Sequence, residues 1–187
     1  KIARHIHLPL QAGNDEILRR MNRKYTKQQF IDLAMKIREK IPDVAITTDI
    51  IVGFPGESEA DVDDTIDVIN TVKFDNAFTF IYSKRTGTPA ASMPDQVPED
   101  EVKKNFDKLL KVVQDTAKEQ ASKLQGRVEN VLVEGVNEHD DSLLTGRMSN
   151  NTLVHFAGDK SLIGSFVNVS LDECHGFYYM GKIAANS

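Results

Sequence analysis

A change in the pattern of apolar residues near position 125 most constrains how this chain folds. Before that point, apolar runs of strand length alternate with stretches whose apolar residues recur at helical spacing. Strands that alternate with helices predict βαβ crossovers and a parallel sheet. The expected strands are residues 6–10, 44–54 and 78–82, and the expected helices are residues 14–21, 26–41, 58–72 and 99–124.

Two of these helices carry a start signal. Thr26 and Gln29 have the spacing of a capping box, and so do Ser58 and Asp61. Such boxes satisfy free backbone N–H groups in the first helical turn, so they fix where a helix begins. We therefore expect both helix starts with their caps formed.

After Gly126 the pattern consists of short strands separated by turn-forming residues. Five strands within about sixty residues predict a small antiparallel β-barrel. The sequence thus predicts an α/β fold with two domains, a partial parallel sheet over residues 1–125 and a barrel over residues 126–187. The expected barrel strands are residues 128–135, 143–147, 153–156, 166–171 and 178–183.

Composition excludes several classes of protein. The chain has 187 residues, of which 40% are hydrophobic and 27% charged, so it is neither disordered nor fibrous. No apolar run approaches the roughly 20 residues that cross a bilayer, and no signal peptide is evident. A single cysteine, Cys174, excludes an internal disulfide framework or a cluster site built from this chain's cysteines alone, and it fits a reducing cytoplasm. Because the chain opens on Lys1 close to a predicted strand, we expect a piece of a longer protein.

Charge is distributed unevenly along the chain. Residues 1–40 hold ten Lys and Arg against four Asp and Glu, whereas residues 126–187 hold four against eight. The whole chain has a formal net charge of −5, so composition does not by itself indicate a nucleic-acid-binding protein. A solvated helix face accounts for most of the basic residues of the first segment.

Several polar residues gather at the carboxyl ends of the predicted parallel strands. Gln11 ends the first strand, Asp49 lies inside the apolar second strand, and the turn of residues 53–57, GFPGE, follows that strand. Ligands of α/β proteins bind at this edge of the sheet. A buried carboxylate such as Asp49 either satisfies neighbouring backbone groups or binds a ligand, and periodicity leaves both readings open. The turn itself is equally well explained as a tight strand-to-helix connection.

Histidines offer weaker signals. His5 and His7 lie two residues apart in a strand and therefore share a face, but no carboxylate or thiol partner is evident, which favours a structural role. Cys174 and His175 read as a loop pair. We assign neither a metal site nor a catalytic residue to this chain.

Five longer segments of the chain are distinctive as strings. They are HLPLQAGND (7–15), MNRKYT (21–26), AITTDIIVGFPGES (45–58), FDNAFTFIYSKRTGTPAASMPDQVP (74–98) and GRMSNNTLVHF (146–156). Together they closely resemble the radical S-adenosylmethionine (SAM) methylthiotransferases, and within them the MiaB family. The resemblance runs through the whole chain in order, and residues 126–187 resemble the TRAM module that ends those enzymes.

The resemblance implies the last three strands of a radical SAM barrel followed by TRAM. It implies insertion of a methylthio group at adenine C2 of N6-isopentenyladenosine in tRNA by SAM radical chemistry, with two [4Fe–4S] clusters. The cluster cysteines would lie upstream, so this chain alone is expected to be inactive. It also implies tRNA and SAM as partners and a cytoplasmic location.

By resemblance, three residues would bind SAM directly. Gln11 and Asp49 would meet the ribose hydroxyls, and Arg23 would meet the carboxylate, in keeping with what these groups can donate and accept. The residues expected near the adenine or the substrate are Gly53, Phe54, Pro55 and Tyr82. In the TRAM module, Arg147 and Asn151 match a G-R-x-x-x-N pattern and are the expected RNA contacts.

The match has departures and alternatives. Ala12 and Met148 stand where the family usually has Ser and Thr, and the TRAM segment is acidic although phosphate contact favours positive charge. Two further readings are a ribosomal-protein aspartate methylthiotransferase and a non-catalytic module that binds RNA or protein. A barrel cut after its third strand would leave the edge of the fourth strand, the first of this chain, unpaired, which predicts that the isolated chain forms a dimer or a higher oligomer.

Overall fold

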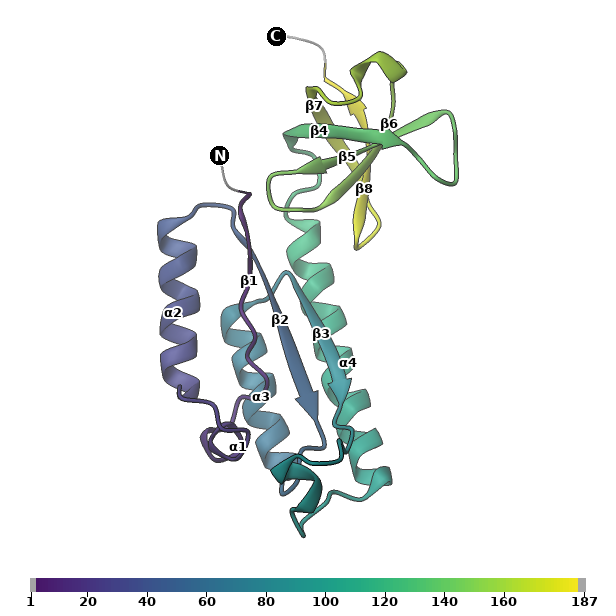
Figure 1. The fold of residues 1–187 in the computed structure, drawn as a ribbon. Helices are drawn as coiled ribbons and strands as arrows, with labels where there is room; N and C mark the ends of the chain where they lie inside the picture. Colours follow the sequence, from purple (N-terminus) through teal and green to yellow (C-terminus); the bar gives the residue numbers. More distant parts are fainter. Residues whose placement is uncertain (1–2, 185–187) are drawn as a thin grey trace. The chain divides into compact units, whose positions relative to one another are not determined.

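The computed structural model describes residues 3–184, which fall into two compact units (Figure 1). Residues 6–42 and 46–117 form the α/β unit, and residues 43–45 and 118–184 with the first described residues form the barrel unit. The end of the last long helix therefore groups with the barrel, through contacts such as the hydrogen bond from the Tyr179 hydroxyl to the Ala121 carbonyl. A boundary at residue 126 stays a prediction.

A three-stranded sheet organises the α/β unit. Its order is β1 (His5–His7), β2 (Ala45–Val52) and β3 (Asn76–Ile81). β2 and β3 are parallel and in register from Thr47 opposite Asn76 to Val52 opposite Ile81. The chain beyond β1 continues alongside β2, as a parallel bridge between Gln11 and Ile50 shows. The predicted parallel sheet is thus confirmed.

Four helices belong to this part of the chain, namely α1 (Asp15–Arg20), α2 (Lys27–Lys40), α3 (Glu59–Val72) and α4 (Glu99–Ser122). Both predicted capping boxes are formed, at Thr26 for α2 and at Ser58 for α3. A short 3₁₀ turn, η1 (Pro89–Ser92), lies in the proline-containing connection before α4.

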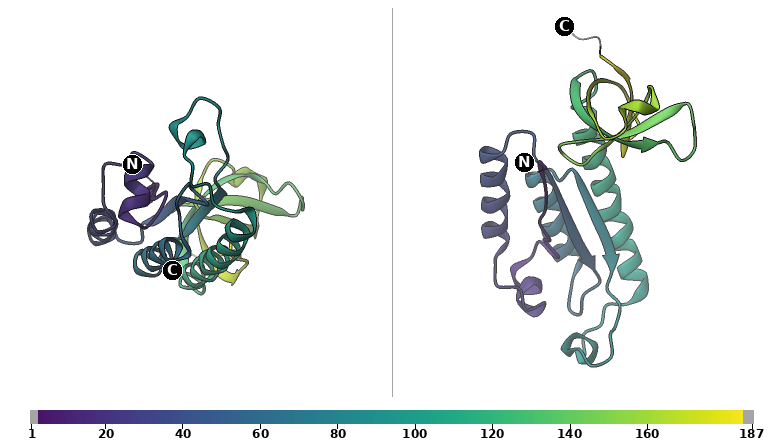
Figure 2. Two further views of the ribbon diagram at one scale, coloured as in Figure 1. Left: turned by 90° about the horizontal axis from the view of Figure 1, so that it is seen from below. Right: turned by 45° about the horizontal axis from the view of Figure 1, so that its top comes forward.

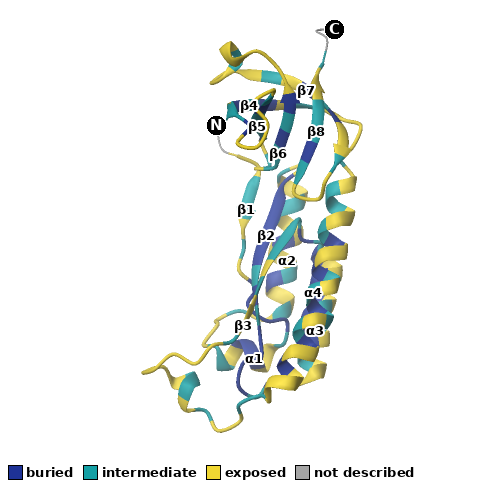
Figure 3. Ribbon diagram, turned by 90° about the vertical axis from the view of Figure 1, so that its right-hand side faces the viewer, coloured by how far each residue is buried: buried dark blue, intermediate teal, exposed yellow. Residues whose placement is uncertain are grey.

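The sheet has one face covered by helices and one open face. α2, α3 and α4 line the same side of the sheet (Figure 2). The β2 side chains that point to that side are at most 1% exposed, and β2 is the buried strand of the three (Figure 3). The alternate side chains of β2 point to the open face, which is where a ligand has access. The covered side chains are Ile46, Thr48, Ile50 and Val52, and the alternate ones include Thr47, Asp49 and Ile51.

The barrel unit contains five strands in the closed order β4-β5-β6-β8-β7. All neighbours pair antiparallel except β6 and β8, which are parallel. Five strands cannot alternate direction all the way around a closed ring, so one pair must be parallel. The bounds are β4 Val128–Val136, β5 Leu143–Met148, β6 Leu153–Ala157, β7 Phe166–Cys174 and β8 Tyr178–Ile183, with a 3₁₀ turn, η2, at Lys160–Leu162.

A compact apolar core fills this barrel, and its members alternate along each strand as the pleat requires. The core residues are Val131, Val133, Leu144, Met148, Val154, Phe156, Val169, Leu171 and Tyr179. Tyr179 has the largest of these buried side chains.

None of the helices within residues 3–184 combines the length and the apolar character that crossing a membrane requires.

Candidate functional site

Gln11, in the segment that follows β1, lies beside Asp49 of β2. The Gln11 amide donates to the Asp49 carbonyl at 2.8 Å, and the Ile51 amide donates to the Gln11 carbonyl at 2.9 Å. Gln11 has a φ of 70°, in the left-handed region that costs a non-glycine residue about 1–2 kcal/mol. The Gln11 side chain is buried but makes no hydrogen bond within residues 3–184, which leaves its carboxamide group available to a ligand.

The Asp49 carboxylate faces the open side of the sheet beside His7. The His7 Nε2 atom lies 3.3 Å from Asp49 Oδ2, and His7 Nδ1 lies 3.0 Å from the Thr47 hydroxyl. The expectation that no carboxylate accompanies the strand histidines is therefore wrong for His7. Because the Asp49 side chain is 29% exposed and pairs only with this imidazole in the described chain, its remaining lone pairs can accept hydrogen bonds from a ligand.

The turn of residues 53–57 is fixed by its own last residue. Gly53 has a φ of 81° and donates its amide to Glu57 Oε2 at 2.5 Å. Glu57 is only 5% exposed, and this burial raises the pKa of its carboxyl to about 7. A Cβ atom on Gly53 would lie 2.7 Å from the Val102 side chain of α4, so the position admits only glycine without rearrangement.

Phe54 and Tyr82 come together in an apolar cluster at the carboxyl end of the sheet. Their ring centroids are 5.3 Å apart in an edge-to-face arrangement. Phe54 and Pro55 are buried, so they support the turn from within. The Tyr82 hydroxyl is buried and has no hydrogen-bond partner among the described residues. The cluster consists of Ala12, Ile17, Leu18 and Phe54, with Met21, Tyr25, Tyr82, Ala90 and Met93 packed against it.

Arg23 stands apart from the other predicted SAM-binding residues. It lies in the exposed connection after α1, and its backbone amide donates to the Leu18 carbonyl at 2.8 Å. Its guanidinium forms no ion pair with any described residue, so the charge is available. The structure does not bring it into contact with Gln11 or Asp49.

Two aromatic residues of β3 were not anticipated as site residues. Phe78 and Phe80 lie opposite Asp49 and Ile51 in the register, and each is about half exposed, at 50% and 51%. The Phe78 ring meets the His7 ring edge-on, with centroids 6.1 Å apart. The alternating string FTFIY was the signal that could have revealed an aromatic row on the open face.

In the barrel, Arg147 and Asn151 contact each other. Arg147 Nη1 donates to the carbonyl and side-chain oxygens of Asn151 at 3.2 and 3.1 Å, and Arg147 Nε donates to Glu134 Oε1 at 2.8 Å. Asn151 has a φ of 73° in the turn between β5 and β6. These contacts give both residues a structural role in holding the turn against β4.

Comparison with known proteins places these observations in a family. Residues 2–69 match the radical SAM superfamily, and residues 122–184 match the TRAM domain. The chain is 53% identical over 183 residues to the tRNA-2-methylthio-N(6)-dimethylallyladenosine synthase of Lachnoclostridium phytofermentans and 52% identical to that of Acetivibrio thermocellus. These matches cover 98% of the chain but 40% and 38% of the two relatives. The chain belongs to the MiaB family.

The fold agrees with this assignment. Coproporphyrinogen III oxidase from Escherichia coli, a radical SAM enzyme, superposes with a TM-score of 0.53 at 14% identity, over 78% of this chain and 41% of that one. At that identity the likeness concerns the fold alone. The chain spans about 40% of the length of the MiaB-family relatives that it matches.

The residues present suit one of the cofactors of radical SAM proteins and not the other. The partly exposed Asp49 carboxylate, the unpaired Gln11 amide and the buried Tyr82 hydroxyl can bond the hydroxyl and amino groups of a nucleoside such as SAM. An iron–sulfur cluster does not fit, since the described residues contain no group of three His, Cys, Asp or Glu able to hold a metal.

Proposed function

We propose that this chain is the SAM-side part of a tRNA methylthiotransferase that modifies C2 of N6-isopentenyladenosine. The observation that carries the proposal is the meeting of Gln11 and Asp49 at the carboxyl edge of a parallel sheet. The similarity to synthases of 2-methylthio-N(6)-dimethylallyladenosine supports it and favours tRNA over the ribosomal-protein substrate of a sibling enzyme.

In this proposal Asp49 accepts hydrogen bonds from the SAM ribose hydroxyls. Its charge makes such bonds roughly twice as strong as those between neutral groups. Gln11 offers both an acceptor and a donor beside it, and Arg23 pairs with the SAM carboxylate through its unpaired guanidinium. The left-handed backbone at Gln11 is held between two backbone hydrogen bonds, which orients the amide before the ligand arrives.

The turn of residues 53–57 and Tyr82 would border the adenine or the substrate base. Phe54 and Pro55 support this border from beneath, because both are buried. Within residues 3–184 the Tyr82 hydroxyl has no hydrogen-bond partner, so a ligand nitrogen or oxygen would satisfy it and recover the free energy lost by its burial.

SAM and a reduced [4Fe–4S] cluster supply the radical chemistry in this enzyme class. The full-length parent would contribute both expected clusters from residues outside this chain, whose single cysteine, Cys174, lies at the end of β7. The chain alone would bind SAM weakly and would not turn over.

The proposed macromolecular partner is tRNA, bound through the TRAM barrel and the mouth of the radical SAM barrel. Arg147 and Asn151 stay our proposed RNA contacts in the barrel. Since Glu134 already neutralises Arg147, any RNA contact there would replace or share that ion pair. We also propose a cytoplasmic location, where tRNA is modified.

The decisive experiment is mass spectrometry of bulk tRNA from a strain that lacks the full-length parent gene. Loss of the 2-methylthio group with accumulation of N6-isopentenyladenosine is expected. Restoration by the wild-type gene, but not by Asp49→Asn, would tie the activity to this site. Unchanged tRNA would overturn the proposal and return attention to the ribosomal-protein or binding-module readings.

A further inference from the structure

Two segments of the α/β unit contain basic residues and no acidic ones. Residues 17–31 hold five Lys and Arg, and residues 76–94 hold Lys84 and Arg85, without a single Asp or Glu in either segment. Both segments pack on the same apolar cluster, the first through Met21 and Tyr25 and the second through Tyr82 and Met93. The structure therefore gathers these cations around the carboxyl edge of the sheet.

Some of these cations are already neutralised by acids from elsewhere. Arg19 pairs with Glu16, Arg20 with Asp95, and Lys27 with Asp64. Lys84 and Arg85 are exposed and have no ion-pair partner within residues 3–184, and Lys24 bonds only to the neutral side chain of Asn22. The unneutralised charge thus lies next to the proposed SAM site.

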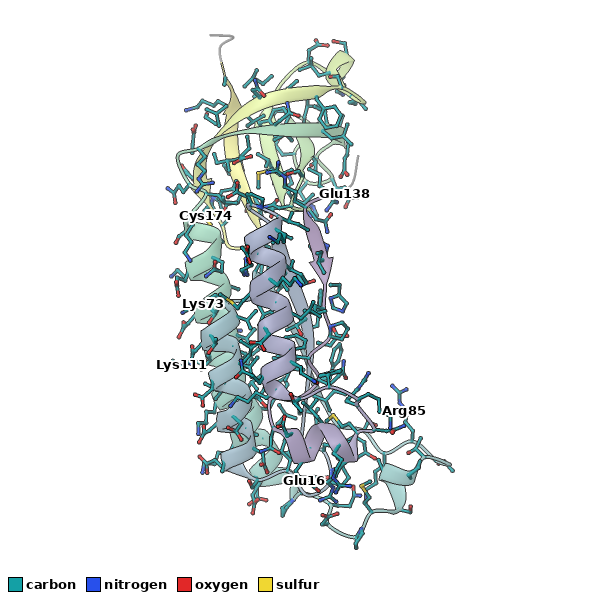
Figure 4. The ribbon with its side chains drawn as sticks, turned by 90° about the vertical axis from the view of Figure 1, so that its left-hand side faces the viewer. Glu16, Lys73, Arg85, Lys111, Glu138 and Cys174 are labelled. Atoms are coloured by element: carbon teal, nitrogen blue, oxygen red, sulfur yellow. The ribbon has the colours of Figure 1, made fainter. Side chains whose placement is uncertain are left out.

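The connection that carries Lys84 and Arg85 has a defined shape. The Arg85 carbonyl accepts hydrogen bonds from the Thr88 amide and hydroxyl, at 3.2 and 2.8 Å, and Gly87 supplies the positive φ of this turn. The Arg85 side chain extends away from the ribbon (Figure 4). Lys84 follows Tyr82 by two residues, so their Cα atoms lie at most about 7 Å apart.

The barrel offers much less free positive charge. Residues 126–187 contain four basic and eight acidic residues. Three of the four, Arg127, Arg147 and Lys182, are paired with carboxylates. A cation held in an ion pair must break that pair to bind phosphate. An unpaired exposed cation has no such pair to lose, so its contact with phosphate gives the larger net gain.

We propose that Lys24, Lys84 and Arg85 form the phosphate-contacting surface for the RNA substrate. This inference rests on the proposed function and deepens it, since it assigns most of the phosphate contacts to the α/β unit rather than to the TRAM barrel. A phosphate held at Lys84 sets a nucleotide within reach of the site bordered by Tyr82. Arg23 is left to the SAM carboxylate.

The test uses the full-length parent and measures tRNA binding across a series of salt concentrations. Lys84→Ala with Arg85→Ala is expected to weaken binding by about tenfold or more at moderate salt. The slope of log affinity against log salt should become shallower by roughly 1.4 to 1.8, as expected for two lost phosphate contacts. SAM cleavage without tRNA should keep its wild-type rate.

A charge-matched control is available on α4. Lys103→Ala with Lys111→Ala removes two exposed lysines that lie outside both acid-free segments, and it is expected to leave affinity and slope near wild type. Wild-type affinity and slope in the Lys84/Arg85 variant, or an equal loss in the control, would overturn the inference while the proposed function stands. A wild-type parent that binds no tRNA would overturn both.

Discussion

His7 and Asp49 pair across the open face of the sheet, with Nε2 and Oδ2 3.3 Å apart. The imidazole is in turn held by the Thr47 hydroxyl at 3.0 Å, so one side of the Asp49 carboxylate is fixed by the protein. The rest of the carboxylate faces outward beside Gln11. This arrangement orients an acceptor before a ligand binds, which reduces the entropy that binding must overcome.

Removing the charge of Asp49 should weaken SAM binding selectively. Asp49→Asn in the full-length parent loses charge-assisted hydrogen bonds worth about 1.5–3 kcal/mol, which corresponds to roughly a 10- to 100-fold weaker affinity. Gln11→Ala should act in the same direction with a smaller effect. Equilibrium binding of SAM to cluster-loaded protein measures both.

Iron content in these variants should stay at the wild-type level, because neither residue belongs to a metal-binding group. Asp32→Asn is a suitable control, since Asp32 is exposed on α2 and bonds only to Gln28. Wild-type SAM affinity in both Asp49→Asn and Gln11→Ala would remove them from the site.

The sequence was most informative where local rules decide structure. Both capping boxes, the positions of all five barrel strands and the parallel sheet follow from spacing and periodicity. The first strand is shorter than predicted: β1 ends at His7, and although the Leu8 amide still donates to the Thr47 carbonyl, the Leu10 amide donates to the Thr48 hydroxyl instead and Gln11 leaves the extended conformation.

Partners distant in sequence could not be read in this way. His7 meets Asp49 only because the register of two strands places them together, and Arg147 meets Glu134 across two barrel strands for the same reason. Charge patterning along the chain does not reveal such pairs, since a cation and its acid partner can be over forty residues apart. The role of Arg147 in holding its own turn therefore became visible only in the structure.

Glu57 should make stability depend on pH in an unusual direction. Its carboxyl has a pKa near 7 when folded, against 4.5 when exposed, so the folded chain keeps a proton that the unfolded chain has released. The free energy of unfolding therefore falls as the pH rises from about 4.5 to 7, by about 3 kcal/mol in total. Glu57→Gln should abolish this component, as measured by denaturant unfolding at several pH values.

The matched control is Glu59→Gln in the first turn of α3. Glu59 is exposed and pairs with Lys104 and Lys108, which lower the pKa of its carboxyl. The Glu59→Gln variant should therefore show the same fall in the free energy of unfolding between pH 4.5 and 7 that Glu57 causes in the wild type. Equal pH profiles for wild type and Glu57→Gln between pH 4.5 and 7 would contradict the assigned role of burial.

Alanine at Gly53 should be more destabilising than alanine at Gly87. Both glycines have a positive φ, 81° and 85°, and so share the backbone cost of an L side chain. They differ in the space around them. A Cβ atom added at Gly53 would lie 2.7 Å from the Val102 side chain, whereas a Cβ atom added at Gly87 would have nothing within 4 Å. We expect Gly53→Ala to exceed Gly87→Ala by about 1–3 kcal/mol in thermal or chemical unfolding. Equal losses would show that α4 yields at this contact.

The exposed edge of β3 should let the isolated chain self-associate. β3 is an outer strand of the sheet, and its Phe78 and Phe80 side chains are half exposed. Light scattering of the isolated chain should report a dimer or larger species, and Phe80→Lys should shift it toward monomer because an edge charge opposes strand pairing. A monodisperse wild-type monomer would contradict this prediction.

Substitutions of Arg147 and Glu134 should change tRNA affinity in opposite directions if Arg147 contacts RNA. If the Arg147 guanidinium contacts RNA, Arg147→Ala in the full-length parent should weaken tRNA binding by a few-fold. Glu134→Gln should strengthen it, because it removes the carboxylate that holds Arg147 Nε at 2.8 Å. Stability should change little in either variant, since an ion pair this exposed contributes at most about 1 kcal/mol.

The directions of the two changes in tRNA affinity distinguish an RNA contact of Arg147 from a purely structural role. A role limited to holding the turn at Asn151 predicts that both substitutions leave tRNA affinity unchanged or lower it together, since both loosen the same link between that turn and β4. Opposite signs require that the guanidinium freed from Glu134 finds a phosphate or base. Binding assays of the two variants, with SAM cleavage in the absence of tRNA as the internal reference, decide between these roles.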